Sequence, residues 1–269
     1  MNKNSNWQIS RSRWMPTFLK NFMPEFLDFI VSLVEANKPF IKLVQTRQRL
    51  KTEFYLYVPE VGGSSILLVS DLKKSFPESV IYILSDQLSE QRQDHFTQLN
   101  PELNRQAKFI KLGTMGLKPL DTQRILIAVN HAHLLSDQQF GEELKMLTSL
   151  FDQILIGEGN NKSVRQVIGM LLLSPLVALV CSPRVKPFRF SRLIFTYLIP
   201  VFPLMISWDG IVALFKIRAP EKIVAIAKNV VSEEWTWTSG KSANNRGGFV
   251  IYLHGSKKSI DEAGRGLRP

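Results

Sequence analysis

The sequence of 269 residues is poor in the residues that support covalent or metal-stabilised folds. It contains one cysteine, Cys181, which excludes a disulfide framework and a cysteine-cluster metal site. Its four histidines include no His-Glu-x-x-His pair, so no zinc enzyme of that kind is expected and no metal ligands are assigned. The first sixteen residues hold three basic residues and no apolar run, so no secretory signal peptide is expected.

Acidic residues are scarce between residues 160 and 219. The whole chain has 34 basic and 23 acidic residues and a formal net charge of +11. Within 160–219, eight lysines and arginines face a single acid, Asp209, so this stretch carries +7 of the total. It is also the most apolar part of the chain. This combination favours an anionic membrane surface over nucleic acid, which binds to basic residues on a polar face.

Two uncharged runs lie in this stretch, and each is shorter than a typical membrane span. Gln166 to Pro183 gives eighteen uncharged residues, and Leu193 to Trp208 gives sixteen. A straight span needs about 20 apolar residues. We expect Ser174-Pro175 to cut the first run, and prolines also interrupt the second. The favoured interpretation is a re-entrant or interfacial hairpin. Two buried core helices and two true spans remain open as alternatives.

Four cations fall in the connection between the two runs: Arg184, Lys186, Arg189 and Arg192. Arginine can bind a phosphate or carboxylate through two parallel hydrogen bonds. We therefore take Arg184, Lys186 and Arg192 as candidates on the substrate side, where they would bind a lipid headgroup. The alternative is a solvated basic face. Asp209 is expected to pair with an arginine of this region, because a lone acid beside cations is stabilised when paired.

The chain from residue 51 onward alternates short strands with longer helices. Strands are predicted at 54–58, 80–84, 107–112, 124–129 and 153–156, with helices at 65–75, 89–99 and 136–150. This alternation is typical of βαβ units and predicts an α/β fold with a doubly wound parallel sheet. A helix at 220–231 and a hairpin of strands at 234–238 and 248–253 follow, which makes seven strands.

Around this core the sequence predicts further segments. Apolar residues at helix spacing predict a helical N-terminal cap, in which Pro24 opens one helix. The expected division is a cap at 1–50, an α/β core at 51–159 and the basic apolar insertion at 160–219. The last helix and hairpin of the core occupy 220–255, and 256–269 is a polar tail that we expect to be disordered.

In a doubly wound sheet, ligands bind at the carboxyl ends of the strands, where the strand order reverses. The turn after the first strand contains Gly62 and Gly63, where backbone amides could approach a nucleotide. Asp86, after the second strand, stands where an acid can hold ribose hydroxyls. These three are the candidate cofactor-binding residues. The alternative is an ordinary turn.

Three further candidates follow later strands. Asn130 and His133 come after the fourth strand, and Glu158 ends the fifth. His133 could act as a general base, or could be a hydrogen-bonded structural histidine. Glu158 could orient a substrate, or merely pair with the nearby Lys162. We place all three on the substrate side, and assign no catalytic residue from the sequence.

The element order resembles class I S-adenosylmethionine-dependent methyltransferases. More specifically, the chain is similar to a bacterial group of such proteins that carries a basic, apolar insertion near the C-terminus. The resemblance covers roughly residues 14 to 253. Its strongest part is the run from Ser182 to Leu193, Ser-Pro-Arg-Val-Lys-Pro-Phe-Arg-Phe-Ser-Arg-Leu, which continues through Phe195-Thr196-Tyr197-Leu198-Ile199-Pro200 to Trp208-Asp209-Gly210.

The chain departs from the family pattern at the cofactor turn. Relatives carry an acid followed by a glycine-rich turn, whereas here Tyr57 stands at the acid and Pro59 and Val61 at the first two glycines. Only Gly63 matches in register. Asn130 and His133 are kept from the Asn-Ala-Phe-His-His segment of relatives, and so is Glu158.

Together with the apolar stretch that carries +7, the resemblance implies a membrane-associated methyltransferase that binds S-adenosylmethionine and acts on an apolar or lipid-like acceptor. It would lie at the cytoplasmic face of the membrane, peripherally or through an inserted hairpin, and otherwise in the cytoplasm. The degenerate turn supports an alternative: a non-catalytic binding or scaffold protein at a membrane surface, built on the same fold.

Overall fold

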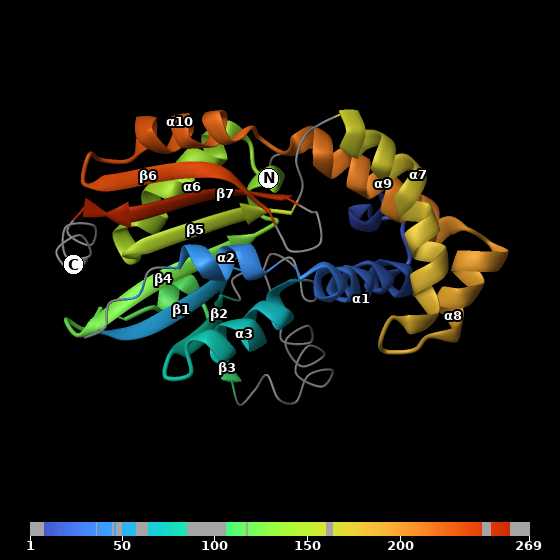
Figure 1. Ribbon diagram of the computed structural model, residues 1–269, viewed down its shortest axis with the longest axis horizontal. Coiled ribbons are helices and arrows are strands. Elements are labelled where there is room, and N and C mark those ends of the chain that lie inside the picture. The colour runs from blue at the N-terminus through green and yellow to red at the C-terminus, as the bar shows by residue number, and fades with distance from the viewer. Residues whose placement is uncertain are drawn as a thin grey trace.

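The computed structural model describes residues 8–35, 37–44, 46, 50–57, 64–84, 106–116, 118–159, 164–243 and 249–258. Two parts are distinct in Figure 1: a sheet domain flanked by helices, and a group of helices that projects from one end of it. We call the second part the helical projection and define it as residues 9–34 together with residues 164–216.

Seven strands form one sheet in the order β3-β2-β1-β4-β5-β7-β6. They span Lys51–Tyr57 (β1), Val80–Leu84 (β2), Ala107–Ile110 (β3), Thr122–Val129 (β4), Gln153–Glu158 (β5), Trp235–Ala243 (β6) and Phe249–Lys257 (β7). Strands β1 to β5 are parallel, whereas β7 runs antiparallel to both β5 and β6. The predicted α/β class and the seven-stranded doubly wound sheet are confirmed.

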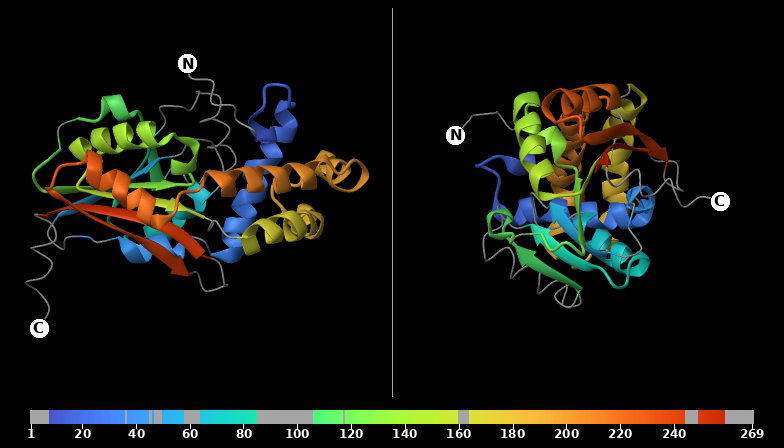
Figure 2. Two further views of the ribbon diagram at one scale, coloured as in Figure 1. Left: turned by 90° about the horizontal axis from the view of Figure 1, so that it is seen from above. Right: turned by 90° about the vertical axis from the view of Figure 1, so that its left-hand side faces the viewer.

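Helices cover both faces of the sheet (Figures 1 and 2). Helices α2 (Lys38–Leu43) and α3 (Ser64–Ser75) pack on one face, and α6 (Asp137–Leu150) and α10 (Pro220–Val230) on the other. Successive side chains of a strand point to opposite faces. Accordingly, Ile125 of β4 packs with the α3 residue Leu68, and the next residue, Leu126, packs with Phe140 of α6. A strand buried on both faces has to be apolar throughout, which explains the unbroken apolar runs in the sequence.

The helical projection has its own apolar core. Its elements are η1 (Ile9–Arg11), α1 (Thr17–Val34), α7 (Val164–Cys181), η4 (Ser182–Arg184), α8 (Phe190–Leu193), the π-helical turn η5 (Ile194–Leu198) and α9 (Val201–Lys216). Phe22 and Phe26 of α1 meet the ring of Phe202 edge-on, with ring centroids 5.7 and 5.6 Å apart. These contacts hold α1 against α9.

The prolines of the projection behave differently from expectation. Pro24 lies inside α1 rather than opening it, and Pro175 lies inside α7, so Ser174-Pro175 does not cut that helix. A proline removes one intrahelical hydrogen bond, and the many remaining bonds of an 18-residue helix keep it continuous. Pro200 does mark a break: the segments Phe190–Leu198 and Val201–Lys216 meet at 81°.

The boundaries of the C-terminal hairpin extend beyond the prediction. Strand β7 continues to Lys257, and Ser256 pairs with Gln153 on one side and Thr236 on the other. The core therefore includes residues that we had placed in the polar tail. The predicted helix at 89–99 and the rest of the tail from residue 259 lie outside the described residues.

Candidate functional site

The candidate site lies where strands β1, β4 and β5 end side by side. These three strands are neighbours in the sheet, and the strand order reverses between β1 and β4. Tyr57 ends β1, Asn130 follows β4 and Glu158 ends β5. The predicted cofactor residues Gly62, Gly63 and Asp86 fall outside the described residues.

Asn130 fixes the ends of β4 and β5 to each other. Its backbone N–H donates to the Gly157 carbonyl at 2.7 Å, and its side-chain oxygen accepts the Gly159 N–H at 2.8 Å. Its φ of 56° lies in the left-handed region, which asparagine tolerates better than most residues. Asn130 therefore shapes the edge of the site through the backbone of β5.

His133 and Glu158 form a closely bonded pair. The Glu158 carboxylate accepts the backbone N–H of His133 at 2.9 Å, and its second oxygen lies 2.8 Å from the His133 Nδ1. Both side chains are buried, with 9% of His133 and 2% of Glu158 exposed. With Nδ1 donating to the carboxylate, the neutral ring carries its lone pair on Nε2. Of the predicted site residues, the structure thus brings Asn130, His133 and Glu158 together.

The loop that carries His133, η3 (Ala132–Leu134), is held on both sides by one arginine. Arg218, just beyond α9, donates to the carbonyl oxygens of Ala132 at 2.6 Å and Leu135 at 2.5 Å. It also pairs with Asp137 at 2.8 Å. A hydrogen bond from Lys222 and a second one from Arg218 lower the pKa of Asp137. The last turn of the helical projection is therefore tied to the candidate base.

A capping box fixes the next helix, α6, at the other end of this loop. The Ser136 hydroxyl accepts the Gln139 N–H, and the Gln139 side chain accepts the Ser136 N–H. This reciprocal pair satisfies two backbone donors that the first turn of a helix leaves open. The direction in which η3 presents His133 is thus determined by Arg218, by Glu158 and by the start of α6.

His131 is a site residue that the sequence analysis did not single out. Its Nε2 lies 2.8 Å from a carboxylate oxygen of Glu143, and its ring centroid is 4.3 Å from that of Tyr57. Only 5% of the residue is exposed, and its Nδ1 has no hydrogen-bond partner among the described residues. No sequence signal identifies this contact, because Glu143 belongs to α6 and Tyr57 to β1.

An orphaned buried nitrogen at the junction of β1 and β4 is where a bound ligand would complete the hydrogen bonding. This edge of the sheet is therefore compatible with a nucleotide cofactor. It presents the Nδ1 of His131, which no described residue binds, and the aromatic ring of Tyr57.

The basic candidates of the insertion lie apart from this site, in the helical projection. Arg184 and Lys186 are exposed in the connection between α7 and α8. Arg192 differs from expectation: it is completely buried, and its guanidinium donates to Glu25 at 2.7 Å and to the Pro187 carbonyl at 2.9 Å. It holds α1 against α8 and is not available to a headgroup.

Two acids of the projection, Glu25 and Asp209, are also buried. Glu25 binds Arg189 as well as Arg192. Asp209 accepts the backbone N–H groups of Ile9 and Ser10, at 2.5 and 3.0 Å, and so fixes η1 to α9. These bonds to backbone donors give Asp209 a structural role.

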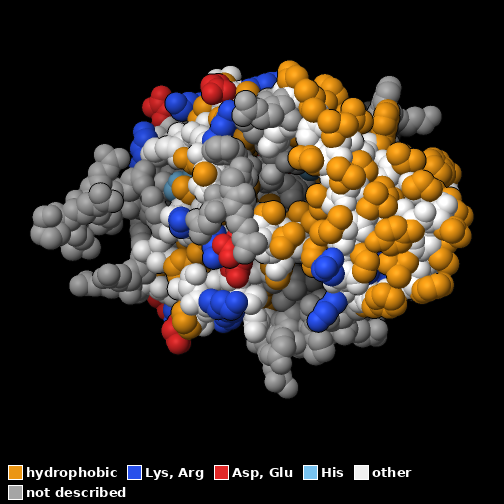
Figure 3. Space-filling view, turned by 45° about the vertical axis from the view of Figure 1, so that its right-hand side comes forward, with side chains coloured by type: hydrophobic (Ala, Val, Ile, Leu, Met, Phe, Trp, Pro, Cys, Tyr) orange, Lys and Arg blue, Asp and Glu red, His pale blue; other side chains and the backbone are white. Residues whose placement is uncertain are grey.

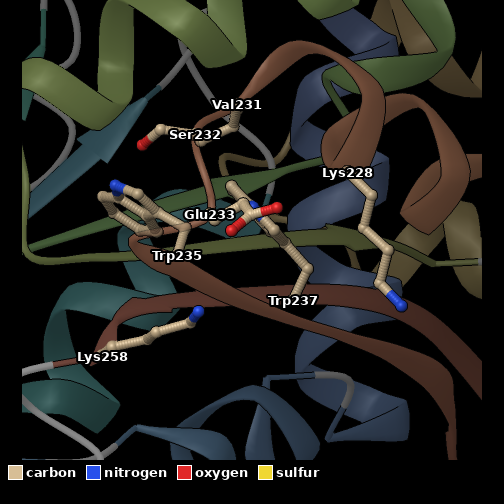
Figure 4. Close-up of a pocket in the computed structure, with 7 residues that line it drawn as sticks. All are labelled: Lys228, Val231, Ser232, Glu233, Trp235, Trp237 and Lys258. Atoms are coloured by element: carbon tan, nitrogen blue, oxygen red, sulfur yellow. The ribbon is translucent and has the colours of Figure 1, made fainter.

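A cavity of about 250 Å³ lies at the other edge of the sheet (Figure 4). Trp235 and Trp237 line it, stacked with ring centroids 5.4 Å apart, together with Lys228 and Lys258. Trp235 begins β6, which runs parallel to β5 because β7 is antiparallel to both. The cavity is therefore at the amino ends of the strands, opposite the candidate site.

Solved structures of other proteins share the overall fold of this chain. The structure of PigF with SAH aligns with a TM-score of 0.50 and 9% identity, covering 88% of this chain and 59% of that chain. The mitomycin 7-O-methyltransferase MmcR aligns with a TM-score of 0.52 and 10% identity, covering 95% of this chain and 61% of that chain. The fold is that of a class I methyltransferase. The chain spans about three fifths of the length of these two proteins.

At such low identity the similarity establishes the methyltransferase-like fold and no more. No family model matches the sequence, and no curated protein matches it. The family resemblance expected from the sequence is thus confirmed at the level of the fold. The roles of individual residues depend on the geometry described above.

Proposed function

We propose that the chain is an S-adenosylmethionine-dependent methyltransferase with an apolar, lipid-like acceptor, and that His133 is its general base. The observation that carries the proposal is the His133–Glu158 pair at the carboxyl ends of β4 and β5 in a methyltransferase fold. This is the edge where a doubly wound sheet binds its ligands.

The pair has the chemistry of an oriented base. Glu158 accepts a hydrogen bond from the Nδ1–H of His133 and so fixes the orientation of the ring. When Nε2 takes up a proton, the Glu158 carboxylate stabilises the resulting imidazolium. The acceptor is a hydroxyl or another heteroatom that carries a proton. As its oxygen or nitrogen forms the new bond to carbon, its proton passes to Nε2, so that no charge builds up on the product.

S-adenosylmethionine, when bound, would supply an electrophilic methyl group. Its sulfur would keep the electron pair of the broken sulfur–carbon bond. The residues that would hold it are the backbone of Gly62 and Gly63, the Asp86 carboxylate and the Nδ1 of His131, to which no described residue is bonded. Positioning the acceptor close to the methyl group supplies most of the rate in such a transfer.

Two observations support an apolar acceptor in a membrane. The helical projection leaves large apolar side chains exposed, and its last turn leads through Arg218 directly to the loop of His133. An acceptor dissolved in a bilayer would reach the base along this route. The exposed cations Arg184 and Lys186 support a membrane with anionic lipid, as at the cytoplasmic face, and nucleic acid is not a proposed partner.

Calorimetric titration of the detergent-solubilised protein with S-adenosylmethionine and S-adenosylhomocysteine tests the proposal. We expect micromolar binding that is lost in Asp86→Ala. Leu120→Ala is the matched control, because Leu120 is fully exposed at the opposite edge of the sheet, beside the start of β4. Absence of both heat and thermal stabilisation at millimolar ligand would reject cofactor binding.

A second candidate function has its own support in the residues. Tyr57 replaces the expected acid and packs on His131, while Pro59 offers no amide and Val61 adds a side chain in the turn. These features favour a non-catalytic protein of a membrane surface. Such a protein would give no heat with either ligand and would transfer no methyl group from labelled S-adenosylmethionine to a lipid extract.

A further inference from the structure

The outer surface of α7, α8, η5 and α9 is strongly apolar. We define the apolar face by six side chains that are 56–80% exposed: Leu172, Leu173, Leu176, Val180, Phe190 and Leu198. In Figure 3, hydrophobic side chains cover the projecting part almost continuously. Soluble monomers rarely expose apolar patches larger than a few hundred Å², and larger ones mark an interaction surface.

The sequence segment of α7 is not that of a buried core helix. Gln166–Arg184 is long and apolar enough to cross a membrane, yet only 11% of it is buried inside the protein. A core helix of the same composition would be largely covered. The alternative of two buried core helices, left open by the sequence, therefore does not hold for α7.

The contact between α7 and α9 uses small and hydroxyl side chains. The Ser174 and Ser207 hydroxyls lie 2.9 Å apart across the two helices. A Cβ on Gly210 would come within 2.5 Å of the Met170 sulfur, so the helices are as close as they are because residue 210 is glycine. Small residues and interhelical hydroxyl bonds are characteristic of helix pairs that pack in lipid, where apolar contacts alone give no advantage over lipid tails.

The projection holds two acids and Arg192, the buried partner of Glu25, inside and other cations outside. The carboxylates of Glu25 and Asp209 are buried, 8% and 5% exposed. Arg184 and Lys186 stand exposed beside the apolar face. In the view of Figure 3, basic side chains border the hydrophobic surface and acidic ones lie over the sheet domain. A surface that combines apolar area with exposed cations is complementary to an anionic lipid leaflet.

The bonds of α1 indicate insertion from the side rather than a span. Arg189 and Arg192, which follow the far end of α7, are ion-paired to Glu25 in the middle of α1. Passing the connection between α7 and α8 through the bilayer would carry these three charges with it, at high cost. Helix α7 is about 27 Å long at 1.5 Å per residue, slightly short of a hydrocarbon core of about 30 Å.

We infer that the apolar face of α7–α9 lies in one leaflet of an anionic bilayer, with Arg184 and Lys186 at its headgroups. The inference deepens the proposed function. It rests on that function in one respect, namely that the leaflet is the source of the methyl acceptor. Binding to the bilayer needs neither cofactor nor turnover.

Flotation of the purified full chain with lipid vesicles tests the apolar contact. We expect binding to vesicles of equal parts phosphatidylcholine and phosphatidylglycerol, and its loss in Leu172→Glu/Leu176→Glu. Leu120→Glu is the matched control, because Leu120 is as exposed as a residue can be but lies in the sheet domain. Equal loss in the control, or no flotation of the unchanged protein, would overturn the inference.

The cations are tested with the same vesicles. Arg184→Glu and Lys186→Glu each remove a cation from the headgroup region, and we expect each to weaken binding at least about fivefold. Pure phosphatidylcholine should bind the unchanged protein more weakly and should not distinguish it from these variants. Binding that is independent of anionic lipid would contradict the role of the two residues.

Labelling separates one leaflet from a span. In a Cys181→Ser background, Lys186→Cys should react with a membrane-impermeant maleimide added outside intact vesicles. Protection until the vesicles are opened would show a spanning hairpin and overturn the one-leaflet arrangement. A mass of two chains in solution that Leu172→Glu reduces to one, without vesicle binding, would assign the apolar face to a second copy of the chain.

The result is independent of the proposed chemistry. His133→Gln should float with vesicles as the unchanged protein does. Flotation without cofactor binding would keep the membrane surface and reject the methyltransferase, whereas cofactor binding without flotation would do the reverse.

Discussion

The sheet domain and the helical projection distribute the same kinds of side chain in opposite ways. In the sheet domain, strands such as β4 are buried on both faces under helices whose polar sides face outward. In the projection, the acids Glu25 and Asp209 are inside and leucines of α7 are outside. The sheet domain thus turns its polar sides outward, whereas the projection exposes apolar side chains, which is the distribution that our proposed contact with lipid requires.

The largest expected effect is on the rate of methyl transfer, and it should affect the sheet domain without affecting the projection. His133→Gln should lower kcat for methyl transfer by about 10²–10⁴, because it removes the base and leaves the ring position filled. Vesicle binding should be unchanged. Glu158→Gln is the companion variant, and it should lower the rate less, because it keeps the imidazole and removes only the carboxylate that orients it. An unaltered rate in both variants would exclude the pair as the base.

Breaking the buried ion pair should destabilise the projection by about 3 kcal/mol or more. Arg192→Met removes the fully buried partner of Glu25 and leaves the buried carboxylate paired only with the partly exposed Arg189, and removing one partner of a buried ion pair is strongly unfavourable. Denaturant unfolding monitored by tryptophan fluorescence measures the change. Arg184→Met, on an exposed arginine, should stay within about 0.5 kcal/mol. Equal effects at the two positions would mean that the Glu25 pair is unimportant.

The same substitution in the two parts should have unequal cost. A Cβ at Gly157 in β5 would lie 2.0 Å from the ring of Phe40, which is 1% exposed. Gly157→Ala should therefore cost about 1–3 kcal/mol in unfolding free energy through overpacking. In Gly210→Ala the obstacle is the flexible side chain of Met170, and alanine is favoured by up to about 1 kcal/mol inside a helix, so the net cost should be smaller. Thermal melting of both variants gives the comparison.

The smallest effect is expected from Asp137, at the junction of the two parts. Hydrogen bonds from Lys222 and Arg218 lower its pKa in the folded state. The stabilisation is therefore present at neutral pH and is lost as the pH falls below about 4, the ordinary range of an aspartate, toward the folded pKa. Because the side chain is half exposed, Asp137→Asn should cost only about 0.5 kcal/mol at pH 7 and nothing at low pH. Stability measured at the two pH values decides.

The sheet could be predicted from the sequence because its signals are local. Strand β2 coincides with its predicted range. Helix α6 begins directly after Ser136, where Ser136 and Gln139 form a capping box, a pattern that is local in the sequence. The predictions made from Pro24 and Pro175 are wrong. A proline usually marks the end of a helix, but a long helix can contain one in its interior. The strand ends also placed Asn130, His133 and Glu158 at one edge, as the parallel order requires.

The partners of buried charged residues could not be predicted in this way. Arg192 and Glu25 are 167 positions apart, and nothing in the run around Arg192 distinguishes it from the exposed Arg184 and Lys186. His131 likewise meets Glu143 and Tyr57 only because α6 and β1 pack beside the end of β4. Such contacts follow from the tertiary fold, and composition alone marks these residues as a basic patch or as a surface histidine.

Arg218 connects the helical projection to the loop of the proposed base. Two of its hydrogen bonds join this residue, two positions beyond the end of α9, to the carbonyl oxygens of Ala132 and Leu135 on either side of His133. Leu204 and Phe215 of α9 are also exposed. If they entered the acyl chains, a tilt of α9 would move Arg218 and, through its hydrogen bonds, the loop that carries His133. Turnover should therefore depend on the state of the interface, and be faster on vesicles than in micelles at equal acceptor concentration. The protein would then show the kinetics of an interfacial enzyme, activated by the surface that also dissolves its substrate.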